Sequence, residues 1–298
     1  MKQQLKGSLY LVLATMIWGS TFIAQSVGMD HIGPFTFQAV RCFMGVLALL
    51  IMIVIADRFK KDGKTFGSRW KSKKLWKAGL LCGVPLFLAC NLQQVGLVNT
   101  DPGKSAFLTA MYILFVPIIG VFRKEKPSKL MPLSILLAMI GLYFLSCMGV
   151  TTISTDDILL LGCAMMFAVQ ITFVDLFAQD LDPLRLNLIQ ALVCAVLSTA
   201  VMFLTEDISM PAIGRCWFPL AYAGVLSMGL AYSLQIIGQK DLKPSLASLI
   251  MSLESVFAVI FGFILLRERL TTWESIGCCF VFAGVILSQI PTEKKQEV

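Results

Sequence analysis

Charged residues are scarce in this sequence. Asp, Glu, Lys and Arg together make up 14% of its 298 residues, whereas an ordinary soluble domain contains about 25%. Hydrophobic residues make up 57%, which is above the roughly 45 to 50% of soluble domains. This composition excludes a typical soluble globular domain and indicates a chain that lies largely within a lipid bilayer.

Histidine is nearly absent, and the cysteines form no recognisable pattern. The single histidine, His31, falls in a short predicted loop. The nine cysteines are scattered, mostly within apolar segments, without the spacing of metal ligands or of a disulfide framework. No nucleophile elbow or similar catalytic motif occurs. We therefore expect no metal, no cofactor and no enzymatic activity, and a membrane-embedded enzyme is the weaker alternative.

Ten apolar stretches are long enough to cross a bilayer as helices. A spanning helix needs about 20 residues because the hydrocarbon core is about 30 Å thick. The sequence therefore predicts an all-α integral membrane protein. The predicted spans are residues 7–28, 34–56, 75–98, 103–122, 129–149, 157–179, 183–204, 216–238, 244–266 and 272–290.

The basic residues gather on one side of the predicted membrane. If the amino terminus is cytoplasmic, most of the 25 Lys and Arg residues are cytoplasmic, including the dense run from Arg58 to Lys77. The exceptions on the opposite side are Lys104, Arg215, Arg267 and Arg269. Because cytoplasmic loops are enriched in Lys and Arg, we predict a multi-pass plasma-membrane protein with both termini in the cytoplasm. The net charge of +7 thus reflects topology, and no nucleic-acid partner is expected.

A short motif containing buried amides occurs twice. The segment "ACNLQQVGL" at residues 89–97 matches "AYSLQIIGQ" at residues 231–239, and the match aligns Gln93 with Gln235. At other offsets, Pro34 matches Pro183 and Trp18 matches Phe167. The repeat divides the chain into residues 1–150 and 151–298, which together form one transport domain.

Each half contains five predicted spans, which is an odd number. The second half must therefore enter the membrane from the opposite side, and we predict two inverted five-helix repeats around a central cavity. Lipid-facing amides are costly, so the repeated amides should face protein or a water-filled cavity. Inverted positions of this kind fit alternating access, although interhelical hydrogen bonding is the alternative reading of each amide.

Two ionisable residues lie inside predicted spans. Glu254 falls about 16 Å beyond Lys243, near the bilayer centre, where a carboxylate is costly and is usually functional. We expect it to contribute to proton coupling or to recognition of a substrate cation; bracing of neighbouring helices is the alternative. Arg41 is expected either to guide an anionic group or to snorkel outward. Asp175, near the end of a span, is expected to be solvated.

The polar and aromatic side chains within the spans define the expected solute site. Trp18 and Tyr112 lie too deep for an interfacial aromatic belt, so they are expected to stack on a solute or to pack in the core. The expected substrate-binding residues are Trp18, Gln38, Arg41, Asn91, Gln94, Tyr112, Gln170, Gln190, Gln235 and Glu254.

The chain resembles the EamA-type transporters of the drug/metabolite transporter superfamily over nearly its whole length. The segments that carry the resemblance are "IWGSTF", "AVRCF", "LTAMYILFVPIIG", "SLASLIMSLESVFAVIFG" and "LRERLTTWESIGCCFVFAGVIL". The resemblance implies two inverted five-helix repeats that export or exchange small metabolites, often amino acids. It also implies roles for Trp18, Arg41 and Glu254. Ser255 replaces the proline usual after the glutamate in this family, so a straighter ninth helix is expected.

These features predict a secondary active transporter or exchanger that works by alternating access within the lipid bilayer. A phosphorylated substrate would require several basic residues in the cavity, and Arg41 alone is available. We therefore expect a small neutral or zwitterionic solute, an amino acid first and a nucleobase-like metabolite second, moved by export and with possible coupling to protons. A passive channel is the alternative, and a monomer and a homodimer both fit the sequence.

Overall fold

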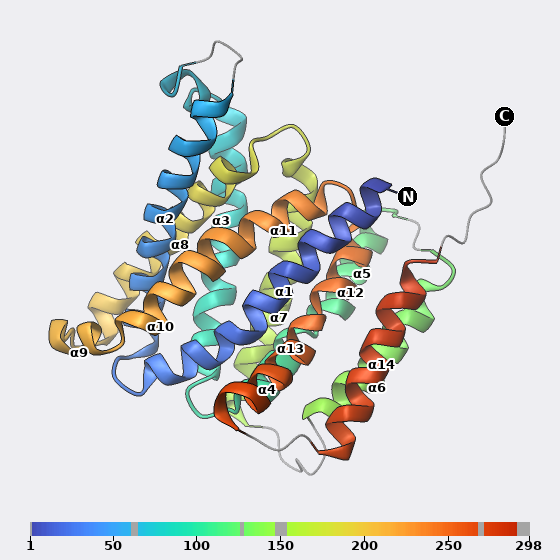
Figure 1. The fold of residues 1–298 in the computed structure, drawn as a ribbon. Helices are drawn as coiled ribbons and strands as arrows, with labels where there is room; N and C mark the ends of the chain where they lie inside the picture. The colour runs from blue at the N-terminus through green and yellow to red at the C-terminus, as the bar shows by residue number, and fades with distance from the viewer. Residues whose placement is uncertain (1, 61–64, 126–127, 147–153, 268–270, 291–298) are drawn as a thin grey trace, which may run out of the picture.

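A computed structural model describes residues 2–60, 65–125, 128–146, 154–267 and 271–290. In this part of the chain the secondary structure is helical, without strands, and the helices pack as one bundle (Figure 1). Consecutive long helices run in opposite directions (Figure 1). We call the end of the bundle where the first helix begins the amino-terminal end, and the other the opposite end.

The described residues of the first half form six α-helices and one short 3-10 helix. Their bounds are α1 (Lys2–Met29), α2 (Pro34–Phe59), η1 (Gly67–Trp70), α3 (Lys73–Gly96), α4 (Pro102–Thr109), α5 (Tyr112–Phe122) and α6 (Met131–Ser146).

In the second half, the part of the chain that the structure describes forms eight α-helices and two π-helical segments. Their bounds are α7 (Thr155–Ala178), α8 (Pro183–Thr205), α9 (Met210–Arg215), α10 (Trp217–Ala221), η2 (Tyr222–Ala231), α11 (Tyr232–Gln239), α12 (Pro244–Met251), α13 (Leu253–Phe261), η3 (Gly262–Leu266) and α14 (Thr272–Ser288). Helix α7 begins at the opposite end, whereas α1 begins at the amino-terminal end (Figure 1).

Eight helical segments of the described chain are long and apolar enough to cross a membrane. These segments correspond to the predicted spans other than the fifth and the tenth. The remaining two predicted spans form the shorter apolar helices α6 and α14, which pack against each other along their length at one side of the bundle (Figure 1).

Two of the predicted spans are interrupted near their middle. The span of residues 102–122 breaks between Thr109 and Tyr112, and that of residues 244–265 breaks at Ser252. The Ser252 hydroxyl donates to the Leu249 carbonyl at 2.7 Å, a type of bond that bends helices. The ninth predicted helix is therefore interrupted at Ser252, although Ser255 stands where the family has its proline.

Helices α2 and α8 are joined by carboxylates at both ends. At the opposite end, Glu206 accepts hydrogen bonds from the backbone N–H groups of Phe35 and Thr36, both at 2.8 Å. These N–H groups belong to the first turn of α2, which lacks intrahelical partners for them. The Glu206 side chain therefore caps a helix other than its own.

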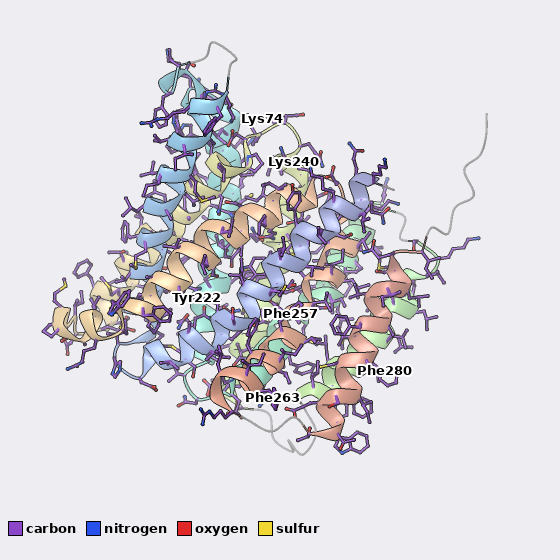
Figure 2. All side chains as sticks on the ribbon, in the orientation of Figure 1. Lys74, Tyr222, Lys240, Phe257, Phe263 and Phe280 are labelled. Atoms are coloured by element: carbon purple, nitrogen blue, oxygen red, sulfur yellow. The ribbon has the colours of Figure 1, made fainter. Side chains whose placement is uncertain are left out.

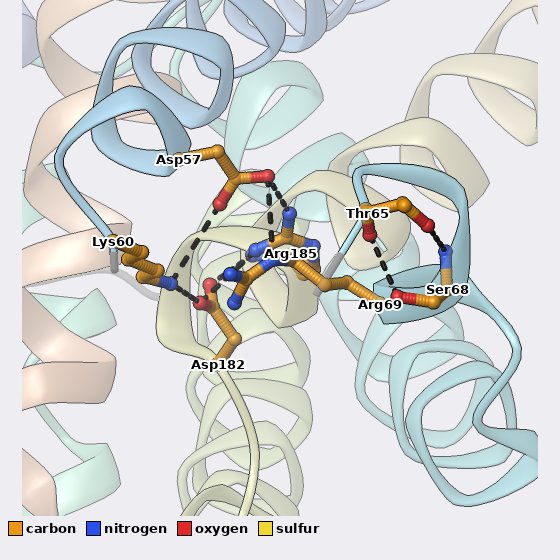
Figure 3. A network of polar contacts seen from close by, with 7 residues as sticks. All are labelled: Asp57, Lys60, Thr65, Ser68, Arg69, Asp182 and Arg185. Atoms are coloured by element: carbon orange, nitrogen blue, oxygen red, sulfur yellow. Dashed lines mark hydrogen bonds and ion pairs between the residues drawn. The ribbon is translucent and has the colours of Figure 1, made fainter. Parts of the chain in front are cut away.

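A cluster of charged residues joins the same two helices at the amino-terminal end (Figure 3). Asp57 at the end of α2 pairs with Arg185 in the first turn of α8. Lys60 lies 2.5 Å from Asp182, the N-cap residue of α8. The Arg185 guanidinium also lies over the ring of Trp70, 5.2 Å from its centroid. Because Arg185 is 2% exposed, these partners compensate a buried charge.

Candidate functional site

A small cavity lies in the middle of the bundle, between the two halves of the chain. Its volume is about 30 Å³, which is room for two or three water molecules at about 10 to 15 Å³ each. Its lining residues are Trp18, Thr21, Phe22, Gln25, Arg41, Gln93, Tyr112, Phe167, Ile171, Ser227, Tyr232, Gln235, Met251 and Glu254. We call this space the central cavity.

Arg41 supplies a buried positive charge to the central cavity. Its side chain is 2% exposed, and its Nε donates to Gln38 Oε1 at 2.6 Å. Its Nη1 donates to Gln25 Oε1. Both partners are neutral, and no ion pair of Arg41 occurs within the described residues. Arg41 therefore points inward rather than snorkelling, and its charge is solvated by amide oxygens alone.

Glu254 supplies an acidic group to the same cavity. It is 4% exposed and accepts a hydrogen bond from the Tyr112 hydroxyl at 2.9 Å. Tyr112 is the first residue of α5, and Glu254 is the second residue of α13. Both groups therefore lie directly beyond a helix break, where interrupted membrane helices commonly form their binding sites.

Aromatic rings form two walls of the central cavity. The rings of Trp18 and Tyr232 have centroids 5.1 Å apart, and those of Tyr112 and Phe167 are 6.5 Å apart. The Trp18 Nε1 atom is buried without a hydrogen-bond partner among the described residues. The cavity therefore combines flat apolar surfaces with an unused N–H donor.

Amide side chains continue from the cavity wall into the protein. Gln235 lines the cavity, and its Nε2 donates to Gln170 Oε1 at 3.1 Å. Gln170 in turn donates to Gln190 at 3.3 Å. On the other side, Gln93 donates to the Thr109 hydroxyl at 3.3 Å. Of these four glutamines, Gln235 and Gln93 line the cavity, whereas Gln170 and Gln190 lie behind its wall.

Five of the ten predicted substrate-binding residues line the central cavity. They are Trp18, Arg41, Tyr112, Gln235 and Glu254. Three more, Gln38, Gln170 and Gln190, stand behind the cavity wall and bond to a lining residue or to one another.

The last two predicted residues, Asn91 and Gln94, do not line the central cavity. Asn91 donates to the Ser198 hydroxyl and to the Phe87 carbonyl, both at 2.8 Å. It therefore joins α3 to α8, as the alternative reading of the amides predicted. Gln94 is fully buried, and neither of its amide atoms has a partner among the described residues.

The sequence reading missed several lining residues, some of which carried a signal. Gln93 is the repeat counterpart of Gln235, and Phe167 is the counterpart of Trp18. Extending each assignment to its counterpart would have identified both. Gln25 and Tyr232 had no such signal, because their counterparts, Val174 and Cys90, are not polar in the same way.

A second, larger space opens at the amino-terminal end of the bundle, and we call it the vestibule. Its volume is about 720 Å³. It is lined by Pro117 and Gly120 of α5, Asp175 of α7 and Leu246 of α12, together with residues near the ends of α1, α6 and α14. Helices α5, α7 and α12 also lead to the central cavity, so the vestibule lies along the same helices.

An ion pair ties two walls of the vestibule together. Arg123, at the end of α5, lies 3.1 Å from Asp175 of α7 and 3.0 Å from Glu125. The Asp175 side chain is 17% exposed. Asp175 is therefore paired with Arg123 and partly exposed at the wall of the vestibule.

The side of the bundle opposite the vestibule is tightly packed. A Cβ atom at Gly19 of α1 would lie 2.6 Å from Phe257 Cβ and 2.7 Å from the Ala258 backbone nitrogen. Phe257 lies where α13 meets α1 (Figure 2). Phe22 and Leu97 belong to a small apolar cluster beyond this contact. No side chain other than hydrogen fits at position 19 in this arrangement.

Helices, cavity and vestibule together define the architecture of a membrane transporter, and the family comparison agrees. The model of the EamA-like transporter family matches the sequence twice, over residues 5–147 and 155–289. The chain belongs to the EamA-like transporter family, within the drug/metabolite transporter superfamily. It is therefore a member of a transporter family and not an enzyme.

Individual relatives cover nearly the whole chain. An uncharacterized transporter of Archaeoglobus fulgidus is 31% identical over 293 residues, which cover 96% of this chain and 86% of the relative. The uncharacterized transporter YoaV of Bacillus subtilis is 22% identical and covers 98% of this chain and 99% of its own length. A solved crystal structure, 16% identical, superposes with a TM-score of 0.77 over 95% of this chain and 96% of its own, which supports the fold.

Proposed function

We propose that the protein is a secondary active transporter that moves a small zwitterionic metabolite, with an amino acid as the leading candidate. The observation that carries this proposal is that Arg41 and Glu254, groups of opposite charge type, both line one cavity. A carboxylate on the solute would pair with the guanidinium, which has only amide partners. A solute ammonium group would face the Glu254 carboxyl. The aromatic walls would hold the apolar part of the solute.

We propose alternating access as the mechanism. The central cavity has room for only a few water molecules, and the vestibule is a separate space. A passive channel needs a continuous path, so the separation favours a carrier over a channel. In a carrier, the vestibule side would close as the opposite side opens. The cavity must also expand, because about 30 Å³ does not admit an amino acid.

We propose that the ten apolar helices form two inverted repeats, residues 1–150 and 151–298. The two separate family matches support this division. Reciprocal contacts support it further: a Cβ at Gly141 would lie 2.6 Å from the Gly277 carbonyl, and a Cβ at Gly284 would lie 2.6 Å from the Ser134 carbonyl. These positions correspond under one sequence offset, and a two-fold relation requires such reciprocity.

A second reciprocal pair relates the two ends of the bundle. A Cβ at Gly238 would lie 2.8 Å from the Gly7 carbonyl, near the amino-terminal end. The counterpart positions are Gly96 and Asp156, where the same distance is 3.1 Å, near the opposite end. Equivalent contacts at opposite ends are what an inverted repeat produces.

We further propose that the vestibule faces the cytoplasm across the plasma membrane, which the bias of Lys and Arg toward that end supports. A solute would then enter from the cytoplasm, which supports export. Glu254 is the proposed proton-coupling group, because a buried carboxyl that pairs only with Tyr112 can exchange a proton for a solute cation.

The test is counterflow in proteoliposomes with a panel of labelled amino acids. We expect exchange-stimulated uptake of at least one zwitterion, which an open channel would not show. The Arg41→Gln protein should lose affinity for that solute by about tenfold to a hundredfold, whereas Arg215→Gln, an exposed arginine, should behave as the unaltered protein. Unchanged affinity in Arg41→Gln would refute the assignment of the carboxylate site.

Proton coupling has its own test. The Glu254→Gln protein should still exchange solute in counterflow but should lose accumulation driven by an imposed pH gradient. Transport by Glu254→Gln at the unaltered rate across pH would eliminate the proton-coupling role.

A further inference from the structure

The buried amides behind the central cavity form one directional hydrogen-bond relay. Gln235 donates to Gln170 at 3.1 Å, Gln170 donates to Gln190 at 3.3 Å, and Gln190 donates to Asn187 Oδ1 at 3.0 Å. The four residues come from α11, α7 and α8. All four are buried, with exposed fractions of 0 or 1%.

The far end of this amide relay fixes its direction. Asn187 Nδ2 lies 3.0 Å from the Met228 carbonyl and 3.0 Å from the Gly229 carbonyl, both in the π-helical segment η2. Backbone carbonyls only accept hydrogen bonds. Asn187 must therefore turn its NH₂ group toward η2 and its oxygen toward Gln190.

The Ser233 hydroxyl, the third neighbour of the Asn187 NH₂ group, favours the same orientation of the Asn187 amide. Asn187 Nδ2 lies 2.9 Å from the Ser233 hydroxyl oxygen. That hydroxyl donates its own hydrogen to the Gly229 carbonyl at 2.7 Å, so it can only accept from Asn187. A flipped Asn187 amide would place its oxygen against two backbone carbonyls, which cannot donate to it, and leaving a buried amide in that state costs about 1 to 3 kcal/mol.

The direction passes along the relay to the cavity wall. Because Asn187 presents its oxygen to Gln190, Gln190 must donate its NH₂ group there and turn its own oxygen toward Gln170. For the same reason the oxygen of Gln170 faces Gln235. Gln235 must then use its NH₂ group within the relay. Its Oε1 has no partner among the described residues, and the residue lines the central cavity.

We infer that the relay holds Gln235 as an obligate hydrogen-bond acceptor, which selects solutes that carry an N–H or O–H donor. This inference rests on the proposed transport function and deepens it. Gln235 contacts the solute, whereas Gln170, Gln190 and Asn187 are positioning residues. A site built to accept a hydrogen bond discriminates strongly against an analogue that lacks the donor, because the buried acceptor is then left unpaired.

Binding of a matched pair of solutes tests the selectivity. The pair is L-leucine and its N,N,N-trimethyl betaine, which keeps the carboxylate and the positive charge but has no N–H. Calorimetry on the purified protein should give a ratio of dissociation constants favouring leucine by about tenfold or more. In Gln235→Leu and Gln170→Leu this ratio should fall by about tenfold, although Gln170 does not line the cavity.

Gln239→Leu is the matched control. Gln239 lies one turn beyond Gln235 on α11, is equally buried at 1% exposure, and donates to the Ile171 carbonyl outside the relay at 3.0 Å. Its substitution should leave the leucine-to-betaine ratio unchanged. If the ratio in Gln170→Leu equals that of the unaltered protein, the steric bulk of the methyl groups explains the selectivity and the inference is overturned.

A second experiment judges the relay without any solute. In Asn187→Asp, an ionised carboxylate would face two carbonyls and a hydroxyl acceptor, so the melting temperature should fall relative to the unaltered protein as the pH is raised. Equal melting temperatures at every pH would refute the fixed direction of the relay. Absence of leucine binding to the unaltered protein, with the expected pH effect in Asn187→Asp, would count against the zwitterion proposal alone.

Discussion

Two equivalent pairs of helices, each made of one helix from either half of the chain, are arranged differently. Helix α13 rests directly on α1, where Gly19 leaves no room for a Cβ atom. In the other pair, the counterparts α7 and α5 border the vestibule of about 720 Å³, and an ion pair from Arg123 to Asp175 links them. The first pair is in contact through the α13 backbone, whereas the second is joined by side-chain contacts beside the vestibule.

This difference gives a physical picture of a transport cycle. If the two pairs exchange their arrangements, the vestibule closes and a similar opening forms beside α13. Two sequence differences accompany this arrangement. At an offset of 149, Gly19 of α1 corresponds to Ala168 of α7, and at an offset of 142, Pro117 of α5 corresponds to Val259 of α13. The glycine permits close approach in the α1–α13 pair, and the proline disfavours a straight helix in the α5–α7 pair.

The largest expected effect comes from breaking the closed pair with Gly19→Ala. The added Cβ would lie 2.8 Å or less from two backbone atoms of α13, so α13 must move. Overpacking of this kind costs about 1 to 3 kcal/mol, or about fivefold to a hundredfold in population. Labelling of a cysteine introduced as Ala106→Cys, in the apolar cluster beyond this contact, should accelerate by that factor.

Gly162→Ala is the control for this substitution. A Cβ at Gly162 meets only Leu92 Cδ1, at an ordinary contact distance of 3.6 Å. It should leave the labelling rate unchanged. Equal rates in Gly19→Ala and Gly162→Ala would mean that the α1–α13 contact does not close the opposite side.

An intermediate effect is expected from Pro117→Val, which gives α5 the residue found in α13. Restoring the backbone N–H allows α5 to straighten. The vestibule should narrow, and labelling of Ser245→Cys in its wall should slow by about threefold to tenfold. Faster labelling would show that the proline draws α5 toward α7 instead.

A smaller effect is expected from Asp175→Asn, which removes the ion pair between the vestibule walls. Both partners are partly exposed, at 27% for Arg123 and 17% for Asp175, so the pair is worth about 0.2 to 1 kcal/mol. Labelling of Ser245→Cys should rise by up to about fivefold. The control is Lys74→Gln, which removes the exposed pair of Lys74 with Asp180 away from the vestibule; a similar rise there would indicate a general loss of stability.

The fold was largely predictable because long apolar runs leave a membrane chain few alternatives. Eight of ten predicted spans appear as long helical segments. The interruptions were not predictable from hydropathy, since "SLIMSLESVF" is apolar throughout apart from its serines and Glu254. At the break the Ser252 hydroxyl bonds to the Leu249 carbonyl, a local contact that hydropathy does not report. The π-helical segment η2 carries no proline within Tyr222–Ala231, and its two glycines, Gly224 and Gly229, do not by themselves predict a π-helix.

The site was predictable in part because a charged side chain within a membrane span is energetically costly and is usually functional. Arg41 and Glu254 could be singled out on this ground, and both line the central cavity. The amides were harder to assign, because an amide that lines a cavity and one that braces helices look alike in sequence. Gln235 and Asn91 come from the same repeated motif, but α11 turns one toward the cavity and α3 turns the other toward Ser198.

The smallest effect concerns α2 and α8, the pair joined by carboxylates at both ends. Burial raises the pKa of Asp182, but hydrogen bonds from Lys60 and the Arg185 backbone, with the charges of both residues, outweigh it and lower that pKa below 3.8. A lowered folded-state pKa contributes stability that is present above the unfolded pKa and lost as the pH falls through the folded value. Asp182→Asn should therefore lower stability at neutral pH by at most about 1 kcal/mol and flatten the acid side of the unfolding profile.

Asn at position 182 can still cap α8, so this substitution isolates the charge from the cap. Solute exchange should remain unchanged, because α2 and α8 are joined at both ends and are expected to move together. Slower exchange in Asp182→Asn, measured by counterflow at neutral pH, would mean that the α2–α8 pair also rearranges. In that case the helices that rearrange during transport would include α2 and α8 as well as the α1–α13 and α5–α7 pairs.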